Sequence, residues 1–86
     1  MKYLIISFKA RNDVYTFDRL LKQNHIFSSI INAPKSIGSS CMLALKTDFK
    51  NFNAVVQILH HIKPNSFFGV FSVEKTNLGE QTLRLA

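Results

Sequence analysis

The hydrophobic pattern of this chain predicts an α+β fold with the element order β-α-β-β-α-β. Three observations predict it: four short apolar runs are typical of strands, two longer segments have the period of amphipathic helices, and each helical segment stands between two strands. Two β-α-β units with right-handed crossovers place both helices on one side of the sheet. We therefore expect the ferredoxin-like arrangement, a four-stranded antiparallel sheet with two helices on one face.

The first strand is expected at residues 3–8, where apolar side chains fall on both faces. Alternation places Leu4, Ile6 and Phe8 on one face and Tyr3, Ile5 and Ser7 on the other. A strand that is apolar on both faces is typical of the centre of a sheet, or of a sheet whose second face is also covered.

The first helix is expected from about residue 14 onward, with an apolar stripe made of Val14, Phe17, Leu20 and Leu21. Asn12 or Asp13 is expected to cap its N-terminus, since a short polar side chain can accept bonds from the first-turn amides. Asn24 and His25 mark the exit, and we expect Asn24 to adopt the left-handed conformation that ends many helices.

The second half of the pattern contains three strands and one helix. Strands are expected at residues 26–32 and 42–47, paired antiparallel because the loop between them has hairpin length. Residues 48–53 supply capping side chains for a second helix, which Pro64 ends. The fourth strand is expected at residues 67–73. The apolar stripe of the second helix consists of Phe52, Val55, Val56, Leu59 and Ile62.

These elements predict one ferredoxin-like domain, residues 1–74, and a polar C-terminal tail, residues 75–86. A chain of 86 residues leaves no room for a second core. The tail is expected to be loose, with Leu83 and Leu85 docking on a neighbour. The sheet face without helices is expected to be open and to form a homodimer. That face would carry Tyr3, Ile5, Met42 and Ala44.

The net charge of +6 favours anionic partners. The basic residues are scattered, however, and no single strand places an aromatic residue between two of them. We therefore expect no specific nucleic acid, and only weak RNA retention that disappears at physiological salt. The N-terminal residues do not match a secretory signal, and no apolar stretch is long enough to cross a membrane. A single free thiol fits a reducing compartment best, so we expect a cytoplasmic protein.

The central candidate for chemistry is a polar loop between the second and third strands, with the only cysteine, Cys41, at its exit. Cations and backbone amides favour the reactive thiolate. The residues that could supply them as an anion-binding site are Lys35, Gly38, Ser39 and Ser40. The alternative is a structural cysteine, since a free cysteine at the start of an apolar strand is commonly a small buried side chain.

The remaining titratable residues have structural explanations. His25, His60 and His61 fall at helix ends, where a cation complements the helix dipole. Asp13 and Asp48 fall at helix starts, where capping explains them. One cysteine excludes an intrachain disulfide and a cysteine-rich zinc site. We expect no metal, no cofactor and no self-contained catalytic centre.

The loop and its cysteine also carry a family resemblance. The chain resembles a family of small bacterial selenium/sulfur carrier-like proteins, also numbered DUF3343, over about residues 2–73. The matching residues are Pro34-Lys35, Ser39-Ser40-Cys41 and Leu43-Ala44-Leu45. The chain departs from the family pattern in two places. Met42 stands where glycine commonly follows the cysteine, and Lys35 stands where arginine commonly follows the proline.

The resemblance implies a carrier in which Cys41 holds sulfur or selenium as a persulfide or selenosulfide. Its partner would be a sulfur- or selenium-donating protein. Two other functions stay open on the residues alone. One is a dimeric protein- or ligand-binding module with a structural cysteine, and the other is a weak RNA-binding module.

Overall fold

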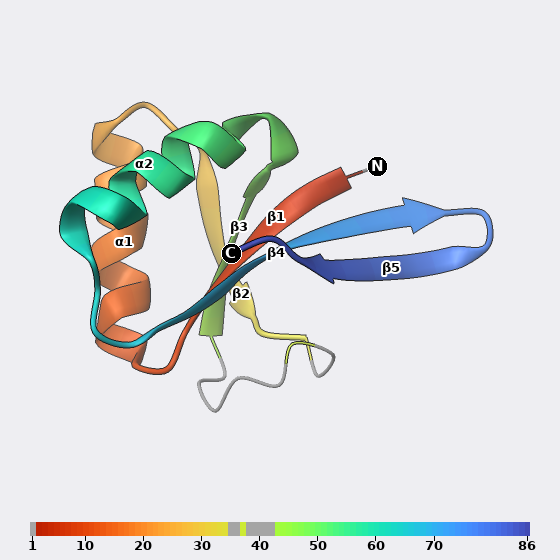
Figure 1. The fold of residues 1–86 in the computed structure, drawn as a ribbon, viewed down its shortest axis with the longest axis horizontal. Helices are drawn as coiled ribbons and strands as arrows, with labels where there is room; N and C mark the ends of the chain where they lie inside the picture. The colour runs from red at the N-terminus through yellow and green to blue at the C-terminus, as the bar shows by residue number, and fades with distance from the viewer. Residues whose placement is uncertain (1, 35–36, 38–42) are drawn as a thin grey trace.

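The computed structural model describes residues 2–34, 37 and 43–86 (Figure 1). Two helices and five strands follow each other in these residues, joined to one short 3-10 turn. The order is β1 (Lys2–Phe8), α1 (Arg11–Gln23), β2 (Ser28–Asn32), β3 (Leu43–Asp48), η2 (Phe49–Asn51), α2 (Phe52–Ile62), β4 (Phe67–Thr76) and β5 (Gly79–Arg84). The strands form one antiparallel sheet in the order β2-β3-β1-β4-β5. The α+β fold is confirmed and is compatible with the ferredoxin-like arrangement, but the sheet has five strands instead of the expected four.

Both helices pack on the same face of the central strand β1. The side chains that β1 turns toward them, Leu4, Ile6 and Phe8, are fully buried. Val14, Phe17 and Leu21 of α1 and Val55 and Leu59 of α2 belong to the same apolar cluster. The Phe8 ring lies 5.4 Å from the Phe17 ring and 6.1 Å from the Phe67 ring, measured between centroids. This cluster is the main core, and the central position predicted for the first strand is confirmed.

The face without helices is covered from within the chain, which corrects the expectation of an open face. Ile5 and Ala44 are fully buried there, in a second cluster with Phe71 and Val73. Ile37, from the segment between β2 and β3, is part of this cluster and is also buried. The open face was expected because only the two helices were considered to cover the sheet, and not the segment that contains Ile37. Met42, which was expected on the same face, lies outside the described residues.

The ends of α1 differ from the expected ones. The N-cap is Ala10, with no side-chain hydrogen bond, and Asp13 lies in the first turn of the helix, where it accepts from the Ser66 hydroxyl. The left-handed residue at the exit is His25, with φ of 61°, and not Asn24. The amides of His25 and Ile26 donate to the carbonyls of Lys22 and Leu21. This bond pattern requires left-handed backbone one residue past the C-cap, and it lets Ile26 pack in the core.

The hairpin of β2 and β3 pairs antiparallel as predicted, from Asn32 opposite Leu43 to Ser28 opposite Thr47. Asp48 then caps η2 by accepting from the amide of Lys50. Helix α2 ends at Ile62, and its C-cap, Lys63, has a left-handed φ of 50° directly before Pro64. Ile62, expected in the apolar stripe, is 41% exposed. Ala54 and Ile58 pack against the core instead, so the side of α2 that faces the sheet includes these two residues.

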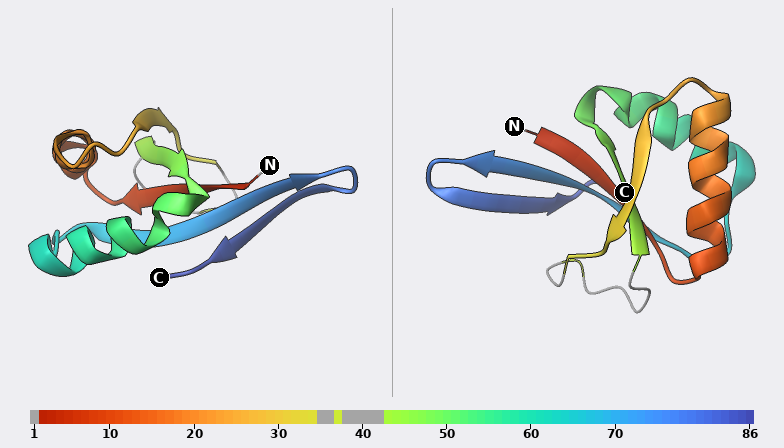
Figure 2. Two further views of the ribbon diagram at one scale, coloured as in Figure 1. Left: turned by 90° about the horizontal axis from the view of Figure 1, so that it is seen from above. Right: turned by 180° about the vertical axis from the view of Figure 1, so that it is seen from behind.

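The residues expected to form a loose tail are the end of β4 and the strand β5. Thr76 pairs with Gly79 across a turn made by Asn77 and Leu78, and Gly79 has a φ of 124°. Figures 1 and 2 show this hairpin extending away from the two helices. Because neither helix covers it, its residues need no hydrophobic alternation. The hydrophobic alternation that predicted the other strands therefore does not occur in β5, and the sequence did not predict this strand.

Candidate functional site

The predicted site residues Lys35, Gly38, Ser39, Ser40 and Cys41 lie outside the described residues. The structure does describe the residues on either side of them, which pack against the sheet or belong to it. The Ile37 amide donates to the Pro34 carbonyl at 3.1 Å, and Ile37 packs in the second apolar cluster. On the other side, Leu43 begins β3 opposite Asn32 of β2. The chain therefore enters and leaves the cysteine segment at one end of the β2–β3 hairpin.

One buried hydroxyl lies at the same end of the sheet. Ser7 of β1 stands between Ala44 of β3 and Gly69 of β4, next to the first residue of β3. Its Oγ is buried and has no hydrogen-bond partner among the described residues. Sequence reasoning placed Ser7 on the helix-free face but attached no importance to it. A serine between two apolar strand residues was the only signal that could have drawn attention to it.

The C-terminal strand is anchored to this face by Arg84. Its Nη2 donates to the Phe68 carbonyl at 2.6 Å, and its guanidinium lies 5.4 Å from the Phe68 ring centroid and 5.8 Å from that of Phe71. Gly69 makes this close approach possible. A Cβ there would lie 3.2 Å from the Arg84 Nε and 3.0 Å from a ring carbon of Phe71. The arrangement explains how a polar strand is held against the apolar cluster.

The three histidines do not converge. His25 is exposed after α1, and His60 and His61 are exposed in the last turn of α2. In the part of the chain that the structure describes, no group of three or more His, Cys, Asp or Glu side chains could hold a metal ion. None of the described helices is both long and apolar enough to cross a membrane.

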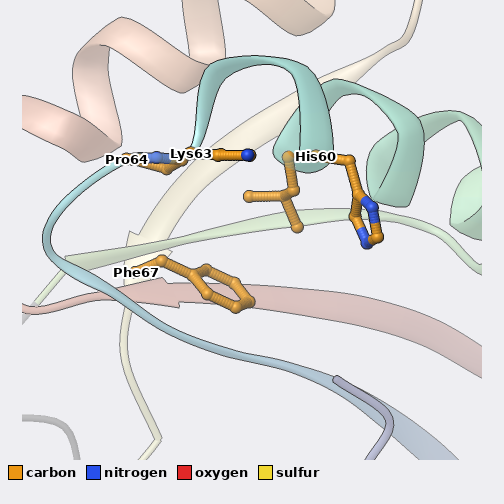
Figure 3. A pocket seen from close by; sticks show the side chains of 5 residues that line it. His60, Lys63, Pro64 and Phe67 are labelled. Carbon is orange, nitrogen blue, oxygen red and sulfur yellow. The ribbon is translucent and has the colours of Figure 1, made fainter.

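A shallow pocket of about 370 Å³ lies between the end of α2 and the start of β4 (Figure 3). His60 and Lys63 come from the helix side, and the Phe67 ring comes from the strand side. Leu59 and Pro64 complete an apolar lining that contains no nucleophile and no carboxylate. The two basic side chains also stand where the helix dipole favours a cation. The pocket by itself therefore indicates no reaction.

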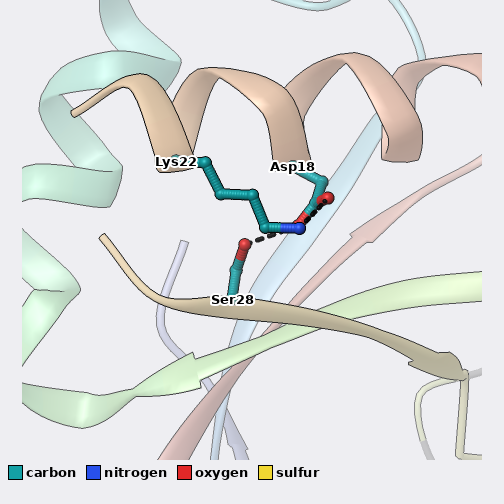
Figure 4. Close-up of polar contacts among 3 residues, drawn as sticks. All are labelled: Asp18, Lys22 and Ser28. Atoms are coloured by element: carbon teal, nitrogen blue, oxygen red, sulfur yellow. Dashed lines mark hydrogen bonds and ion pairs between the residues drawn. The ribbon is translucent and has the colours of Figure 1, made fainter. Parts of the chain in front are cut away.

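The buried carboxylate of Asp18 has a structural explanation. Its Oδ1 accepts from the Ser28 hydroxyl at 2.5 Å, and its Oδ2 accepts from the Lys22 ammonium at 2.9 Å (Figure 4). The Ser28 contact joins α1 to the first residue of β2, whereas the Lys22 contact lies within α1. Both carboxylate oxygens are occupied, so this acid links two elements and is not a candidate general base.

The comparison with known families brings these observations together. Residues 2–68 match the family described as "Putative Se/S carrier protein-like". This chain belongs to that family. The match to the Se/S carrier-like family begins with β1, includes the cysteine segment and both helices, and ends at the second residue of β4. The β4–β5 turn and β5 therefore lie beyond the residues that match. Neither a curated protein nor a solved structure matches the chain.

Proposed function

We propose that this protein carries a sulfur or selenium atom on Cys41 and delivers it to another protein. The family match supports this proposal, because the matched residues 2–68 contain Cys41, the only cysteine of the chain. A carrier needs one thiol that can be loaded and unloaded. No other side chain of this protein forms a persulfide.

The loading step is a transfer between thiols without net oxidation. The Cys41 thiolate attacks the terminal sulfur of a persulfide on the donor protein, and a new S–S bond forms on Cys41. The original S–S bond of the donor breaks, and its cysteine leaves as a thiolate. The proton lost by Cys41 balances the one that the donor thiolate takes up. With a selenosulfide donor, the transferred atom is selenium and the electron count is the same.

The residues before Cys41 are proposed to favour its thiolate. Lys35 supplies a positive charge in the same loop, and the amides of Gly38, Ser39 and Ser40 are potential donors to an anion. The net charge of +6 suits a donor protein with an acidic surface. A reducing compartment such as the cytoplasm would keep the thiol free for loading.

The test is the intact mass of the protein after incubation with a cysteine desulfurase and cysteine. We expect wild type to gain the mass of one sulfur atom and Cys41→Ser to gain none. Ser29→Ala, on β2, keeps the thiol and its proposed surroundings and serves as the control, which should still be loaded. The gain should be lost on treatment with a reductant. A wild type that gains no sulfur from the desulfurase would contradict the carrier function.

The alternative function, a dimeric binding module with a structural cysteine, is favoured by one observation. The projecting β4–β5 hairpin presents Leu78, which is fully exposed, and Leu83, which is 58% exposed. Exposed leucines on a projecting element are typical of an interaction surface. A homodimer that uses this hairpin is compatible with the carrier function, so the mass measurement and the oligomeric state test different properties.

A further inference from the structure

A second pocket, of about 320 Å³, lies at the end of the sheet where β1 starts and β3 ends. Its lining includes Tyr3 of β1, Ser29 of β2 and Lys46 of β3, together with Phe27 just before β2. Lys2 and Asp48 also line it, although the Lys2 ammonium lies 4.0 Å from the Phe49 ring centroid. The pocket therefore gathers aromatic and basic side chains that are distant in the sequence.

The most unusual feature of this pocket is Phe27. Its side chain is 81% exposed, although burying a phenylalanine is favourable by about 1.5–3 kcal/mol. The backbone of this residue is nevertheless held in place, because its carbonyl accepts from the Thr47 hydroxyl at 2.7 Å. The exposed ring therefore projects from a fixed position of the backbone, where a flat ligand can stack on it.

The positive charge of the pocket is also held in place. The Lys46 ammonium lies 4.4 Å from the Tyr3 ring centroid, and both side chains are half-buried. No carboxylate among the described residues is in ion-pair contact with Lys46. Asp48, the acid among the lining residues, accepts through its Oδ1 from the Lys50 amide as the cap of η2. Lys46 is therefore available to an anion.

We infer that this pocket binds a nucleotide, with the base stacked on Phe27 and a phosphate near Lys46. A free phosphate would not need the aromatic ring, and an apolar partner would not need the lysine. Only a ligand that joins a flat ring to an anion uses both. The volume fits one nucleotide, which can be free or part of a single strand. The site is independent of the cysteine and of the carrier function.

This inference revises one expectation. No single strand carries an aromatic residue between two basic ones, but the sheet brings Tyr3, Phe27 and Lys46 together from separate segments. Stacking tolerates any base, so binding without sequence preference is still expected. Stacking also depends less on salt than phosphate contacts do. Binding should therefore persist in part at an ionic strength of about 0.15 M.

The first experiment separates stacking from general attraction. Binding of uridine monophosphate is measured by calorimetry, and binding of a short labelled oligouridylate by fluorescence anisotropy. We expect Phe27→Ala to weaken binding roughly tenfold, since one base stacked on an aromatic ring contributes about that much. Tyr15→Ala, which removes an exposed aromatic residue from α1, should leave binding unchanged.

The second experiment separates a placed charge from net charge. Lys46→Gln and Arg19→Gln each remove one positive charge, but only Lys46 lies in the pocket. We expect a severalfold loss of affinity for Lys46→Gln and little change for Arg19→Gln. Circular dichroism of each variant should match wild type, and Cys41→Ser should bind as wild type does.

The outcomes decide the proposal. Binding of the monophosphate supports a site for a free nucleotide, and binding of the oligomer alone supports a site for a single strand. Absence of both would overturn the inference. Equal losses for Phe27→Ala and Tyr15→Ala, or for Lys46→Gln and Arg19→Gln, would reduce the interaction to net charge and also overturn it. Equal competition by double-stranded RNA, whose bases are already stacked, would have the same meaning.

Discussion

Ser7 shows how much one atom can matter in a small protein. Its hydroxyl is buried on the helix-free face without a hydrogen-bond partner among the described residues. A buried unpaired polar group costs about 1–3 kcal/mol. In a chain of this size such a penalty is a substantial part of the total stability.

We predict that Ser7→Ala raises the free energy of unfolding by about 1 kcal/mol, because it removes the unpaired hydroxyl and little else. Urea denaturation followed by circular dichroism measures this change. Ser29→Ala, a half-buried serine on β2 of the same face, is the matched control and should change stability little. A loss of stability in Ser7→Ala would mean that the hydroxyl has a partner in the folded protein.

At Asp18 we predict a loss of stability, in contrast to the gain predicted for Ser7→Ala. Asp18→Ala leaves the buried Ser28 hydroxyl without its acceptor, so we expect the free energy of unfolding to fall by about 1–3 kcal/mol. Lys22→Gln removes only the solvent-exposed half of the ion pair and should cost at most about 1 kcal/mol. Similar losses in the two variants would show that the buried hydrogen bond between α1 and β2 contributes no more than the ion pair within α1.

Lys35 tests the proposed environment of the thiol. Under the carrier proposal, replacing Lys35 with Gln removes a nearby cation and leaves less of Cys41 as thiolate. We predict a severalfold slower reaction of Cys41 with iodoacetamide at neutral pH. Lys50→Gln, which lies in η2, makes the same change of net charge and should leave the rate unaltered. Protection of the thiol until the protein unfolds would instead support the structural cysteine.

Among the elements, β5 depends most on a single backbone conformation. Gly79 has a φ of 124°, which side chains rarely adopt, whereas a Cβ there would meet nothing within 4 Å. The penalty of a substitution is therefore conformational and not steric.

We predict that Gly79→Ala destabilises the hairpin by about 1–3 kcal/mol and exposes the β5 amides to solvent. Hydrogen exchange measures this, with faster exchange in β5 and unchanged protection in β1. Gln81→Ala, an exposed position on the same strand, should change neither. Unaltered exchange in Gly79→Ala would show that the hairpin does not need the left-handed turn.

For the whole molecule, the covered second face changes the expected effect of mutations on assembly. Ile5 was expected to lie in a dimer interface, but it is fully buried within the chain. A charged residue at this position would break the second apolar cluster and unfold the protein. The exposed leucines of the β4–β5 hairpin are the better candidates for contact with a second copy.

We predict that Leu83→Lys shifts the protein toward a monomer, measured by light scattering, while its circular dichroism is unchanged. Ile5→Lys should instead lose the circular dichroism of the fold. Ile62→Lys, which alters an exposed apolar residue on α2, serves as control and should leave the mass in solution as in wild type. A wild type that is monomeric at high concentration would rule out the homodimer.

The sequence by itself determined the elements that must bury apolar side chains. Alternation over residues 3–8 predicted the central strand, and helical spacing predicted α1 and α2, because each of these elements packs against the main core. The cysteine segment likewise identified the family that the match confirms. Hydrophobic burial leaves a periodic trace in the sequence, and this is why these predictions succeeded.

Only the tertiary structure decided the features that depend on contacts between distant residues. Strand β5 is polar and forms through backbone pairing with β4, which leaves no hydrophobic period. Ile37 covers Ile5 although thirty-two positions separate them in the chain (37 − 5). The pocket at Phe27 joins residues of three strands and their flanks. The hydrophobic pattern of a segment indicates which of its side chains are buried. Which side chains from different segments come into contact depends on how the strands pair in the folded protein.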